Sequence, residues 1–341
     1  MQYILFLLRR AAHSILVLLG LSIIIFIISR VMPGDPARMA LGPYATQEQV
    51  AALRQEMGLD LPLWTQYVRY MSNLVQGQFG KSLISERDVR LDLAHHLPAT
   101  LELIMMTMFW VVVIGIPLGA LSAVKKDTAF DNLTRGFSFT AVVIPGFLVG
   151  IGFQLLFGYW LDWFPITGRL SPGTVVTQKI TGLYLIDALI LRDWHLFFDA
   201  LKHILLPSLA LSMAGIGQVI RITRSSMLEI ETQDHVQVVR SYGVPNLLVT
   251  FKYILKPAFI PTLNILGLLS ASLLGNAFLV ESVFSWPGVA KYGVNAMLQK
   301  DINGLVGVVL LIGLGFLLAN LIVDMIIGLL DPRIRLKGEA E

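Results

Sequence analysis

Long uncharged apolar runs alternate with shorter polar segments along the whole chain. Five runs contain no Asp, Glu, Lys or Arg, namely 103–124, 136–161, 204–220, 257–280 and 302–323, and a sixth, 11–29, is interrupted only by His13. About 20 apolar residues span a bilayer as a helix, and an open strand edge in lipid would leave backbone groups unpaired. The pattern therefore predicts an all-α polytopic membrane protein with six transmembrane helices.

Two of these runs need interpretation. Run 204–220 is short for a span, so we expect its helix to continue a few residues past Arg221. Run 11–29 follows Arg9 and Arg10, as the core of a signal peptide does, but it is longer than such a core. No small-x-small cleavage site precedes Arg30. We interpret this run as a retained helix.

The composition agrees with a membrane protein. Hydrophobic residues make up 55% of the chain, charged residues 14%, and the mean hydropathy is +0.70, whereas soluble domains carry about 25% charged residues. The absence of cysteine excludes a disulfide framework, a thiolate metal site and a cysteine nucleophile. The net charge of +3 suggests a nucleic-acid partner only until the charges are placed along the chain.

The positions of Lys and Arg predict the orientation. With six spans, half of the 26 basic residues fall in the two termini and two fairly short loops, all on one side. The other half are spread over three longer loops, which cross a membrane largely regardless of charge. Both termini are therefore predicted to be cytoplasmic, and the basic character of the chain is explained without nucleic acid.

The first outer loop, 32–97, is predicted to be helical. Thr46 and Gln49 have capping-box spacing before a helix that Gly58 would end. Pro62 opens a second, amphipathic helix, and Asp88 could cap a third short one that leads to Pro98. Two interpretations stay open for this region: a cover over helix ends, or a docking surface for an extracytoplasmic partner.

The other outer loops carry turn and interface signals. Ser171-Pro172-Gly173 is typical of a turn, and Phe284-Ser285-Trp286-Pro287-Gly288 is typical of a rigid one. The aromatic cluster of Trp194, Phe197 and Phe198 lies next to a span, where such rings usually anchor the chain at the membrane interface.

The inner loop 221–256 is the longest connection on the predicted cytoplasmic side. Residues 227–242 are long enough for a helix along the membrane surface, and Gly243 followed by Pro245 is a helix-stop signal. This helix could fit a socket on a soluble partner or rest on anionic lipid. Its apolar residues favour the partner.

Several kinds of chemistry are missing from the sequence. It contains no P-loop for a nucleotide, no His-Glu-x-x-His zinc motif and no Gly-x-Ser-x-Gly nucleophile motif. The pairs Gly115/Gly119 and Gly146/Gly150 indicate close helix packing rather than ligand binding. Few polar residues lie in or near the spans: Glu102, Gln154, Gln218, Asn264, Asn276, Asn320 and Asp324. We therefore predict a transport subunit without catalytic, cofactor-binding or metal-binding residues of its own.

Several motifs in order along the chain resemble those of a known family. They are Leu8-Arg9-Arg10, Met32-Pro33-Gly34-Asp35-Pro36, Gly58-Leu59-Asp60-Leu61-Pro62, Leu97-Pro98-Ala99-Thr100-Leu101-Glu102-Leu103, Gly115-Ile116-Pro117-Leu118-Gly119, Thr223-Arg224-Ser225-Ser226-Met227-Leu228-Glu229, Phe284-Ser285-Trp286-Pro287-Gly288 and Asp331-Pro332-Arg333-Ile334-Arg335. Together they resemble the first permease subunit of the dipeptide/oligopeptide/nickel ABC importers.

The resemblance implies a site in the inner loop. The family's coupling motif reads roughly Asp-Tyr-Val-Arg-Thr-Ala-Arg-Ala-Lys-Gly, and residues 234–243 match it at Asp234, Val236, Arg240 and Gly243. Gln237 and Tyr242 replace two basic residues, and Val239 replaces a small one. The ATPase-coupling residues implied by this match are Glu229, Asp234, Val236, Val239, Arg240 and Gly243.

The resemblance also implies a type I ABC importer fold and a set of partners. These are a homologous second permease, two cytoplasmic ATP-binding subunits that hold ATP and Mg, an extracytoplasmic solute-binding protein and membrane lipid, in the cytoplasmic (inner) membrane of a bacterium or archaeon. The chain would divide into an N-terminal helix (1–31), an extracytoplasmic helical loop (32–97), a five-helix permease core (98–331) with the coupling loop 221–256, and a cytoplasmic tail (332–341).

The substrate implied is a dipeptide or oligopeptide. Thr181-Gly182-Leu183-Tyr184 looks like dipeptide-type members, whereas His235 looks somewhat like nickel-type members. Nickel or a metal chelate is therefore the alternative within the family. A stand-alone secondary transporter driven by an ion gradient is the alternative from another class, although the spans hold almost no buried carboxylates for it.

Overall fold

The computed structural model describes residues 15–27, 36–41, 44–56, 58–176 and 178–330. An apolar helix, Ile15–Ile27, comes first. It is followed by α2 (Pro36–Leu41), α3 (Gln47–Glu56), α4 (Leu63–Val75), α5 (Val89–Trp110), η1 (Val111–Gly115), α6 (Ile116–Val124), α7 (Ala129–Val143), α8 (Gly146–Phe153), η2 (Gln154–Trp160), α9 (Tyr184–Leu191), α10 (Trp194–Glu231), α11 (Asp234–Ser241), α12 (Asn246–Leu248), η3 (Val249–Leu255), α13 (Lys256–Val283), α14 (Val289–Leu298) and α15 (Ile302–Leu330). The predicted all-α class is confirmed for these residues. Of the family-like motifs, 8–10, most of 32–36 and 331–335 lie outside them.

The chain forms two compact units, which are described separately. The core unit contains 97–291 and the end of α15 from residue 315. The N-terminal unit contains the described residues up to His96 together with 292–314. Helices α5, α14 and α15 contribute residues to both units.

Four helical stretches are long and apolar enough to cross a membrane: 89–124, 194–231, 246–283 and 302–323. A fifth candidate is the pair of helices 129–143 and 146–160, and the helix Ile15–Ile27 is apolar but shorter. The described residues therefore contain four or five candidate spans. The expected extension of the 204–220 helix past Arg221 is confirmed, because α10 continues to Glu231.

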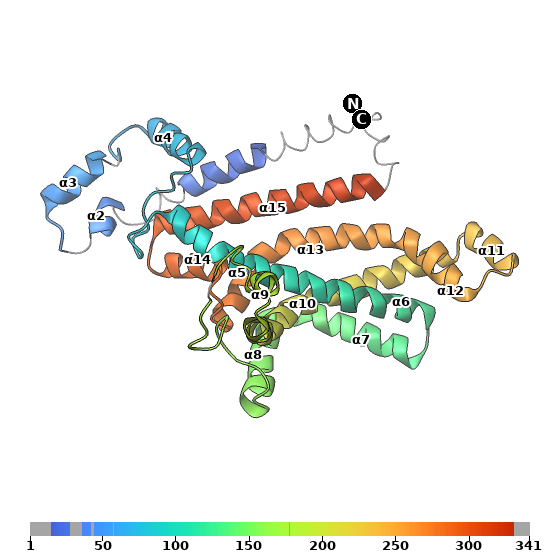
Figure 1. Cartoon of the computed structure of the whole chain (residues 1–341). Helices are drawn as coiled ribbons and strands as arrows, with labels where there is room; N and C mark the ends of the chain where they lie inside the picture. Colours follow the sequence, from blue (N-terminus) through green and yellow to red (C-terminus); the bar gives the residue numbers. More distant parts are fainter. Residues whose placement is uncertain (1–14, 28–35, 42–43, 57, 177, 331–341) are drawn as a thin grey trace. The chain divides into compact units, whose positions relative to one another are not determined.

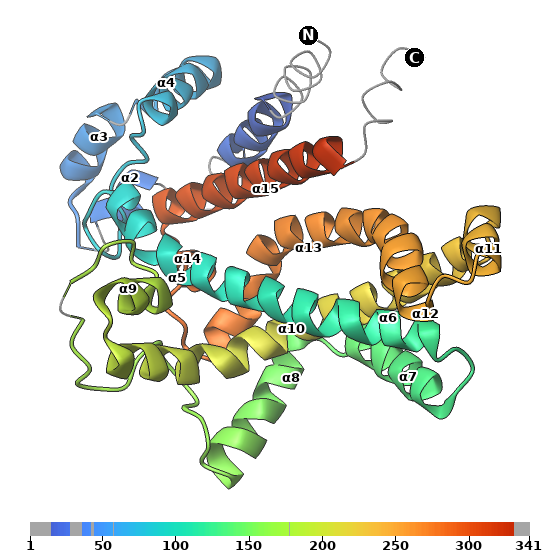
Figure 2. The same cartoon turned by 45° about the vertical axis from the view of Figure 1, so that its right-hand side comes forward.

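The run 136–161 does not form the straight span that the sequence predicted. The chain bends by 104° between α7 and the stretch formed by α8 and η2. Ile144 at the bend has extended backbone angles, φ −78° and ψ 122°, because the ring of Pro145 disfavours a helical residue before it. This bend directs α8 away from α7 in Figures 1 and 2.

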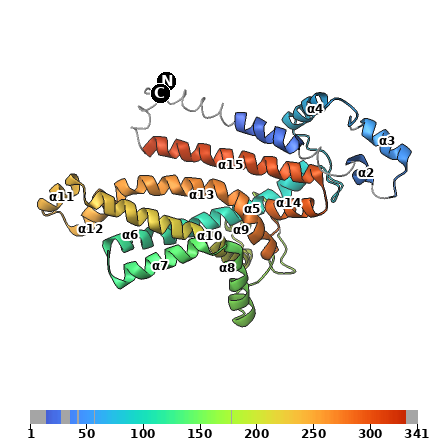
Figure 3. The ribbon, with the colours of Figure 1, turned by 180° about the vertical axis from the view of Figure 1, so that it is seen from behind.

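Helix α10 is the central element of the core unit. In the most apolar 18-residue stretch of this helix 72% is buried, whereas the corresponding stretches of the other three single spans are 17–39% buried. It packs against α6, α7, α8 and α13, and it runs beside α13 and α6 in Figure 3.

Glycines bring the neighbouring helices close to α10. A Cβ on Gly119 would lie 2.8 Å from the carbonyl oxygen of Ile220, and one on Gly217 would lie 2.6 Å from that of Ser138. The Ser138 hydroxyl donates to the Gly217 carbonyl oxygen at 2.5 Å. A Cβ on Gly146 would lie 3.1 Å from the carbonyl oxygen of Ala210. The two glycine pairs therefore serve packing, as the sequence predicted.

A buried carboxylate joins three elements near the connection between α6 and α7. Asp131 is fully buried, and its two oxygens accept hydrogen bonds from Nε and Nη2 of Arg224 on α10 at 2.6 and 2.7 Å. Ser122 on α6 donates to the same carboxylate at 2.5 Å, and so does the backbone N–H of Asp127 at 3.0 Å. Four donors thus compensate the removal of this charge from water.

The N-terminal unit contains the capping box that the sequence predicted. The backbone N–H of Thr46 donates to Gln49 Oε1 at 3.0 Å, and the backbone N–H of Gln49 donates to Thr46 Oγ1 at 3.3 Å. Gly58 ends this segment in the left-handed region, with φ +65°. Asp301, fully buried before α15, accepts a hydrogen bond from Ser82 at 2.5 Å.

The third short helix predicted for this region is the beginning of α5. Its backbone N–H at Arg90 donates to the Asp88 side chain at 2.8 Å, so the predicted cap is present. The helix then continues through Pro98 instead of ending there. Pro98 is followed by the apolar run of a span, whose packing holds the helix together across the missing N–H.

We expect Asp131→Asn to lower the free energy of unfolding of the chain by about 3 kcal/mol, because Arg224 would be left without its carboxylate. Thermal unfolding of the purified chain in detergent measures this loss. Asp127→Asn is the matched control, since Asp127 is exposed at φ +62°, where Asn is well tolerated. Equal effects of the two variants would contradict the role assigned to the Asp131 carboxylate.

Candidate functional site

The predicted coupling helix is formed, but with different boundaries. The sequence predicted one helix over 227–242, whereas α10 runs through to Glu231 and α11 begins at Asp234. Gln233 between them is extended, with φ −75° and ψ 147°. The span and α11 are therefore separated by a two-residue break, and α11 and α12 lie at the same end of α10 and α13 in Figure 1.

One face of α11 is anchored in the core unit. Val236 is completely buried and packs in a cluster with Met227 of α10, Ala123 of α6 and Val249 of η3. Val239, one turn further, packs against the same cluster. Because this cluster includes residues of three spans, a displacement of α11 is transmitted to their ends through direct packing.

The opposite face of α11 is open. Asp234, Gln237 and Arg240 are exposed, as is Glu229 in the last turns of α10. Arg240 forms an ion pair with Glu231 at 2.5 Å, which links the two helices across the break. Because both side chains are more than a third exposed, this pair contributes little to stability.

Gly243 ends α11 in a conformation that glycine favours. Its φ is +72°, and its N–H donates to the carbonyl oxygen of Arg240 at 3.0 Å. No atom lies within 4 Å of the position that a Cβ would take. The requirement for glycine here is therefore conformational and not steric.

The structure divides the six predicted coupling residues into two groups. Val236 and Val239 face the protein, whereas Glu229, Asp234 and Arg240 are exposed, and Gly243 shapes the end of the helix. The predicted set omits Val238 and Tyr242, which are 52% and 82% exposed. Their spacing of four residues on one face is the sequence signal that would have found them.

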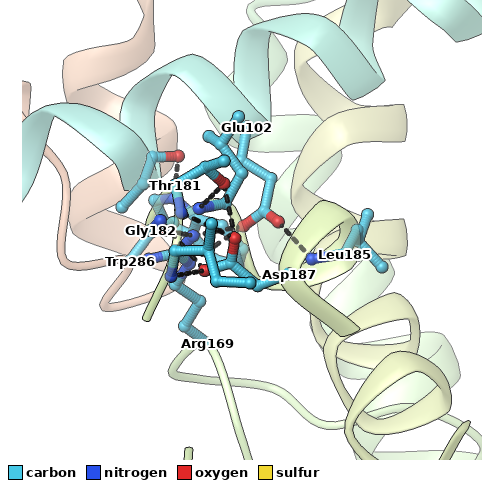
Figure 4. Close-up of polar contacts among 10 residues, drawn as sticks. Glu102, Arg169, Thr181, Gly182, Leu185, Asp187 and Trp286 are labelled. Atoms are coloured by element: carbon cyan, nitrogen blue, oxygen red, sulfur yellow. Dashed lines mark hydrogen bonds and ion pairs between the residues drawn. The ribbon is translucent and has the colours of Figure 1, made fainter. Parts of the chain in front are cut away.

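A second polar site lies within the core unit, where Glu102 of α5 meets Arg169. Both are nearly buried, with 4% and 8% exposure. Nε and Nη2 of Arg169 donate to the same oxygen of Glu102 at 2.9 and 2.5 Å, and the other oxygen accepts the backbone N–H of Leu185 at 2.7 Å. Figure 4 shows these contacts converging from α5, the η2–α9 loop and α9.

Aromatic rings complete the surroundings of Arg169. Its guanidinium carbon lies 3.7 Å from the ring centroid of Tyr184 and 5.8 Å from that of Trp286. Such contacts stabilise a desolvated cation. The guanidinium also donates to the carbonyl oxygen of Gly182 at 2.8 Å, and Trp286 Nε1 donates to the carbonyl oxygen of Ala99 at 2.8 Å.

Asp187 of α9 organises the loop segment 180–182 beside this ion pair. Its carboxylate accepts hydrogen bonds from the backbone N–H groups of Ile180, Thr181 and Gly182 and from the Thr181 hydroxyl. Burial alone would raise the pKa of Asp187, but these four donors outweigh it and lower the pKa below the ordinary aspartate value. Asp187 is therefore ionised at neutral pH.

Glu281 at the end of α13 extends this polar region to the turn that follows it. It is fully buried, accepts the Thr100 hydroxyl at 2.6 Å and accepts the backbone N–H of Lys291 at 2.9 Å. Gly288 packs directly against its carboxylate, so the turn leaves no room for a Cβ there. The sequence predicted this turn to be rigid, and these contacts give the reason.

Sequence reasoning placed Glu102 near a helix end, where it could reach water or an arginine. The arginine partner is confirmed, but Glu102 lies inside α5, 13 residues after its first residue, and is buried. Gln154 donates to the carbonyl oxygens of Ile166 and Val283 at 2.7 and 3.1 Å. Asn264 and Asn276 are exposed on α13, and the side chain of Asp324 lies outside the described part of the chain.

These arrangements support positioning rather than chemistry. In the part of the chain that the structure describes, no three His, Asp or Glu side chains are grouped so that they could hold a metal ion. The ion pairs join α5 to the η2–α9 loop and α7 to α10, and α11 presents an exposed face at the end of the bundle. Helix α11 is therefore held to the spans by packing on one face and is open to solvent on another.

Comparison with protein families decides what kind of protein this is. Residues 115–336 match the family described as binding-protein-dependent transport system inner membrane component, and residues 3–104 match its N-terminal domain. The chain belongs to this permease family.

Three relatives cover nearly the whole permease. The probable D,D-dipeptide transport system permease protein DdpB of Escherichia coli is 38% identical over 96% of both chains. The dipeptide transport system permease protein DppB of Alkalihalophilus pseudofirmus is 35% identical, over 96% of this chain and 98% of the relative. The glutathione transport system permease protein GsiC of Salmonella paratyphi A is 32% identical, over 97% and 99%. The resemblance to dipeptide ABC permeases is confirmed.

We expect Glu102→Gln to destabilise the permease by about 3 kcal/mol, because Arg169 would remain buried without a counter-charge. Adding Arg169→Met removes the unpaired charge and keeps most of the side-chain volume, so the double variant should recover at least half of the loss. Thermal unfolding in detergent compares the three proteins. A double variant less stable than Glu102→Gln alone would contradict the ion-pair explanation.

Proposed function

We propose that this chain is the membrane-spanning permease subunit of an ATP-driven importer for dipeptides or short oligopeptides. It forms the translocation path together with a homologous second permease. Two cytoplasmic subunits bind ATP and Mg and supply the energy, and an extracytoplasmic binding protein delivers the peptide. In this proposal the permease itself catalyses no reaction and holds no cofactor.

The observation that carries this proposal is the near full-length similarity to permeases named for peptide transport. The reported relatives are named for D,D-dipeptides, dipeptides and glutathione, which is itself a tripeptide. These names favour peptides over the nickel alternative. Membership in a binding-protein-dependent family likewise favours the importer over a stand-alone ion-coupled transporter.

The geometry of α11 supports a mechanical role in this importer. Val236 and Val239 anchor one face of the helix in the spans, while Val238 and Tyr242 are available to an ATP-binding subunit. When ATP brings its two binding subunits together, a docked α11 moves with them. The packed cluster then carries this movement into α6, α10 and η3.

The membrane topology in this proposal follows the distribution of Lys and Arg along the chain. We propose six spans, with the bent pair of 129–143 and 146–160 as one of them and the N-terminal apolar run as another. Both termini and α11 then lie in the cytoplasm, and residues 32–97 lie on the extracytoplasmic side of a bacterial or archaeal inner membrane. The N-terminal region is positioned to receive the binding protein.

Purification from the native membrane tests the assembly directly. The chain is tagged, extracted in mild detergent, and its partners are identified by mass spectrometry. A homologous permease together with P-loop ATPases is the expected result. Recovery of the chain alone or as a homo-oligomer would contradict the importer and favour the ion-coupled alternative.

We expect Gly243→Val to reduce ATP-driven dipeptide uptake about tenfold, because a β-branched residue at positive φ costs about 1–2 kcal/mol and distorts the end of α11. Gly243→Asn tolerates the left-handed region and should retain most of the activity. Uptake of a radiolabelled dipeptide, normalised to the permease present in the membrane, gives the measurement. Normal uptake with Gly243→Val would exclude a coupling role for this turn.

Removal of the exposed ring in Tyr242→Ala should weaken retention of the ATP-binding subunits about tenfold, as expected for an aromatic residue central to an interface. Co-purification across a detergent-wash series measures retention. Tyr159→Ala provides the control, because Tyr159 is similarly exposed, at 75%, on η2. If both variants retain the ATPases equally, Tyr242 does not contact them.

A further inference from the structure

A pocket in the core unit lies outside both sites described above. Its volume is about 640 Å³. One wall is the beginning of α10, and the other is the loop segment 171–174. The lining side chains from α10 are Trp194, His195, Phe198, Asp199 and Lys202.

The loop wall is held firmly against the helix. Pro172 and Gly173 form the centre of a turn in which Gly173 has φ +92° and the Thr174 N–H donates to the Ser171 carbonyl oxygen at 3.1 Å. Asp199 accepts three hydrogen bonds from this turn: the Ser171 N–H at 2.9 Å, its hydroxyl at 2.6 Å and the Thr174 hydroxyl at 3.0 Å. Asp199 Oδ1 also lies 3.4 Å from Nδ1 of the buried His203. The Asp199 carboxylate is thus engaged in hydrogen bonds within the protein.

The wall formed by α10 carries two aromatic rings and a lysine ammonium group on one face of the helix. Trp194, Phe198 and Lys202 are four residues apart and share one face of α10. The two rings are 58% and 57% exposed. Among the described residues, Lys202 has no hydrogen-bond or ion-pair partner for its ammonium group. In the first turn of α10 the Leu196 N–H donates to the Asp193 side chain at 3.0 Å.

The position of Lys202 along α10 gives its depth in the membrane. Between Lys202 and Arg221 the helix carries no Asp, Glu, Lys or Arg. At about 1.5 Å per residue these two cations are separated by about 28 Å, close to the thickness of about 30 Å of the hydrocarbon core. Lys202 therefore lies at the level of the lipid phosphates, and Phe198 and Trp194 lie about 6 and 12 Å further from the bilayer centre along α10.

We propose that this pocket binds the headgroup of an anionic phospholipid from the surrounding bilayer. The Lys202 ammonium pairs with the lipid phosphate, and the rings of Phe198 and Trp194 flank the polar headgroup on the side of the phosphate that faces away from the bilayer centre. Asp199 shapes the pocket by fixing the 171–174 turn. This site rests only on the insertion of α10 in a membrane, so it stands or falls independently of peptide transport.

The test uses the full chain in its native complex, reconstituted in nanodiscs of phosphatidylcholine with increasing phosphatidylglycerol. Native mass spectrometry counts the phosphatidylglycerol molecules that stay bound. Lys202→Gln should weaken the tightest binding about tenfold, since it removes a hydrogen bond to a charged group. Lys202→Arg should bind as the unaltered chain does, and Trp194→Ala should also weaken binding.

Lys179→Gln is the matched control, because Lys179 is exposed in the same loop outside the pocket. Equal losses in Lys179→Gln and Lys202→Gln would indicate diffuse attraction of anionic lipid and overturn the proposal. Displacement of the lipid by the same concentration of inorganic phosphate would assign the site to a soluble anion instead. Unchanged lipid binding in Lys202→Gln with weaker binding of an extracytoplasmic protein would assign the pocket to that partner and also overturn the lipid site.

Discussion

The core unit depends on the pairing of charges that cannot reach water. Glu102 and Arg169 are both nearly buried, and every oxygen of the carboxylate has a donor. In an apolar environment an unpaired charge costs several kcal/mol, so the loop that carries Arg169 has only one favourable position. Through Gly182, Tyr184 and Trp286 that position also fixes α9 and the turn after α13. The contacts of a single ion pair thus join α5, α9 and the turn after α13.

Asp131 and Arg224 apply the same constraint at the other end of the helix formed by α5, η1 and α6, where Ser122 donates to Asp131. Glu102 and Ser122 are separated by 20 residues of nearly continuous helix, about 30 Å at 1.5 Å per residue. Between the two polar clusters α10 makes contact through small residues and apolar side chains, which allow close approach but specify little about register. The register of α10 is specified by Arg224, which pairs with Asp131. The helix formed by α5, η1 and α6 is thus held near both ends by a polar cluster.

Local signals in the sequence predicted local structure well. The capping box at Thr46, the positive-φ glycines at Gly58 and Gly243 and the turn at Pro172 all depend on a few neighbouring residues, and each was found as expected. Predictions that depended on how far an apolar run continues were less accurate. The bend at Pro145, the continuation of α5 through Pro98 and the break at Gln233 each involve a competition between a local preference and packing in the spans.

The sequence by itself determined that this protein is helical, that it lies in a membrane, which family it resembles and where helix α11 ends, although it placed the start of that helix seven residues too early. These properties follow from hydrophobic periodicity and short motifs, which act over one or two turns. Only the tertiary structure decided that Glu102 pairs with Arg169, that Asp131 pairs with Arg224, and which face of α11 is anchored. These partners are 67 and 93 residues apart in the chain, so no local pattern links them. They meet because the spans pack side by side and the low-dielectric interior favours contact between opposite buried charges.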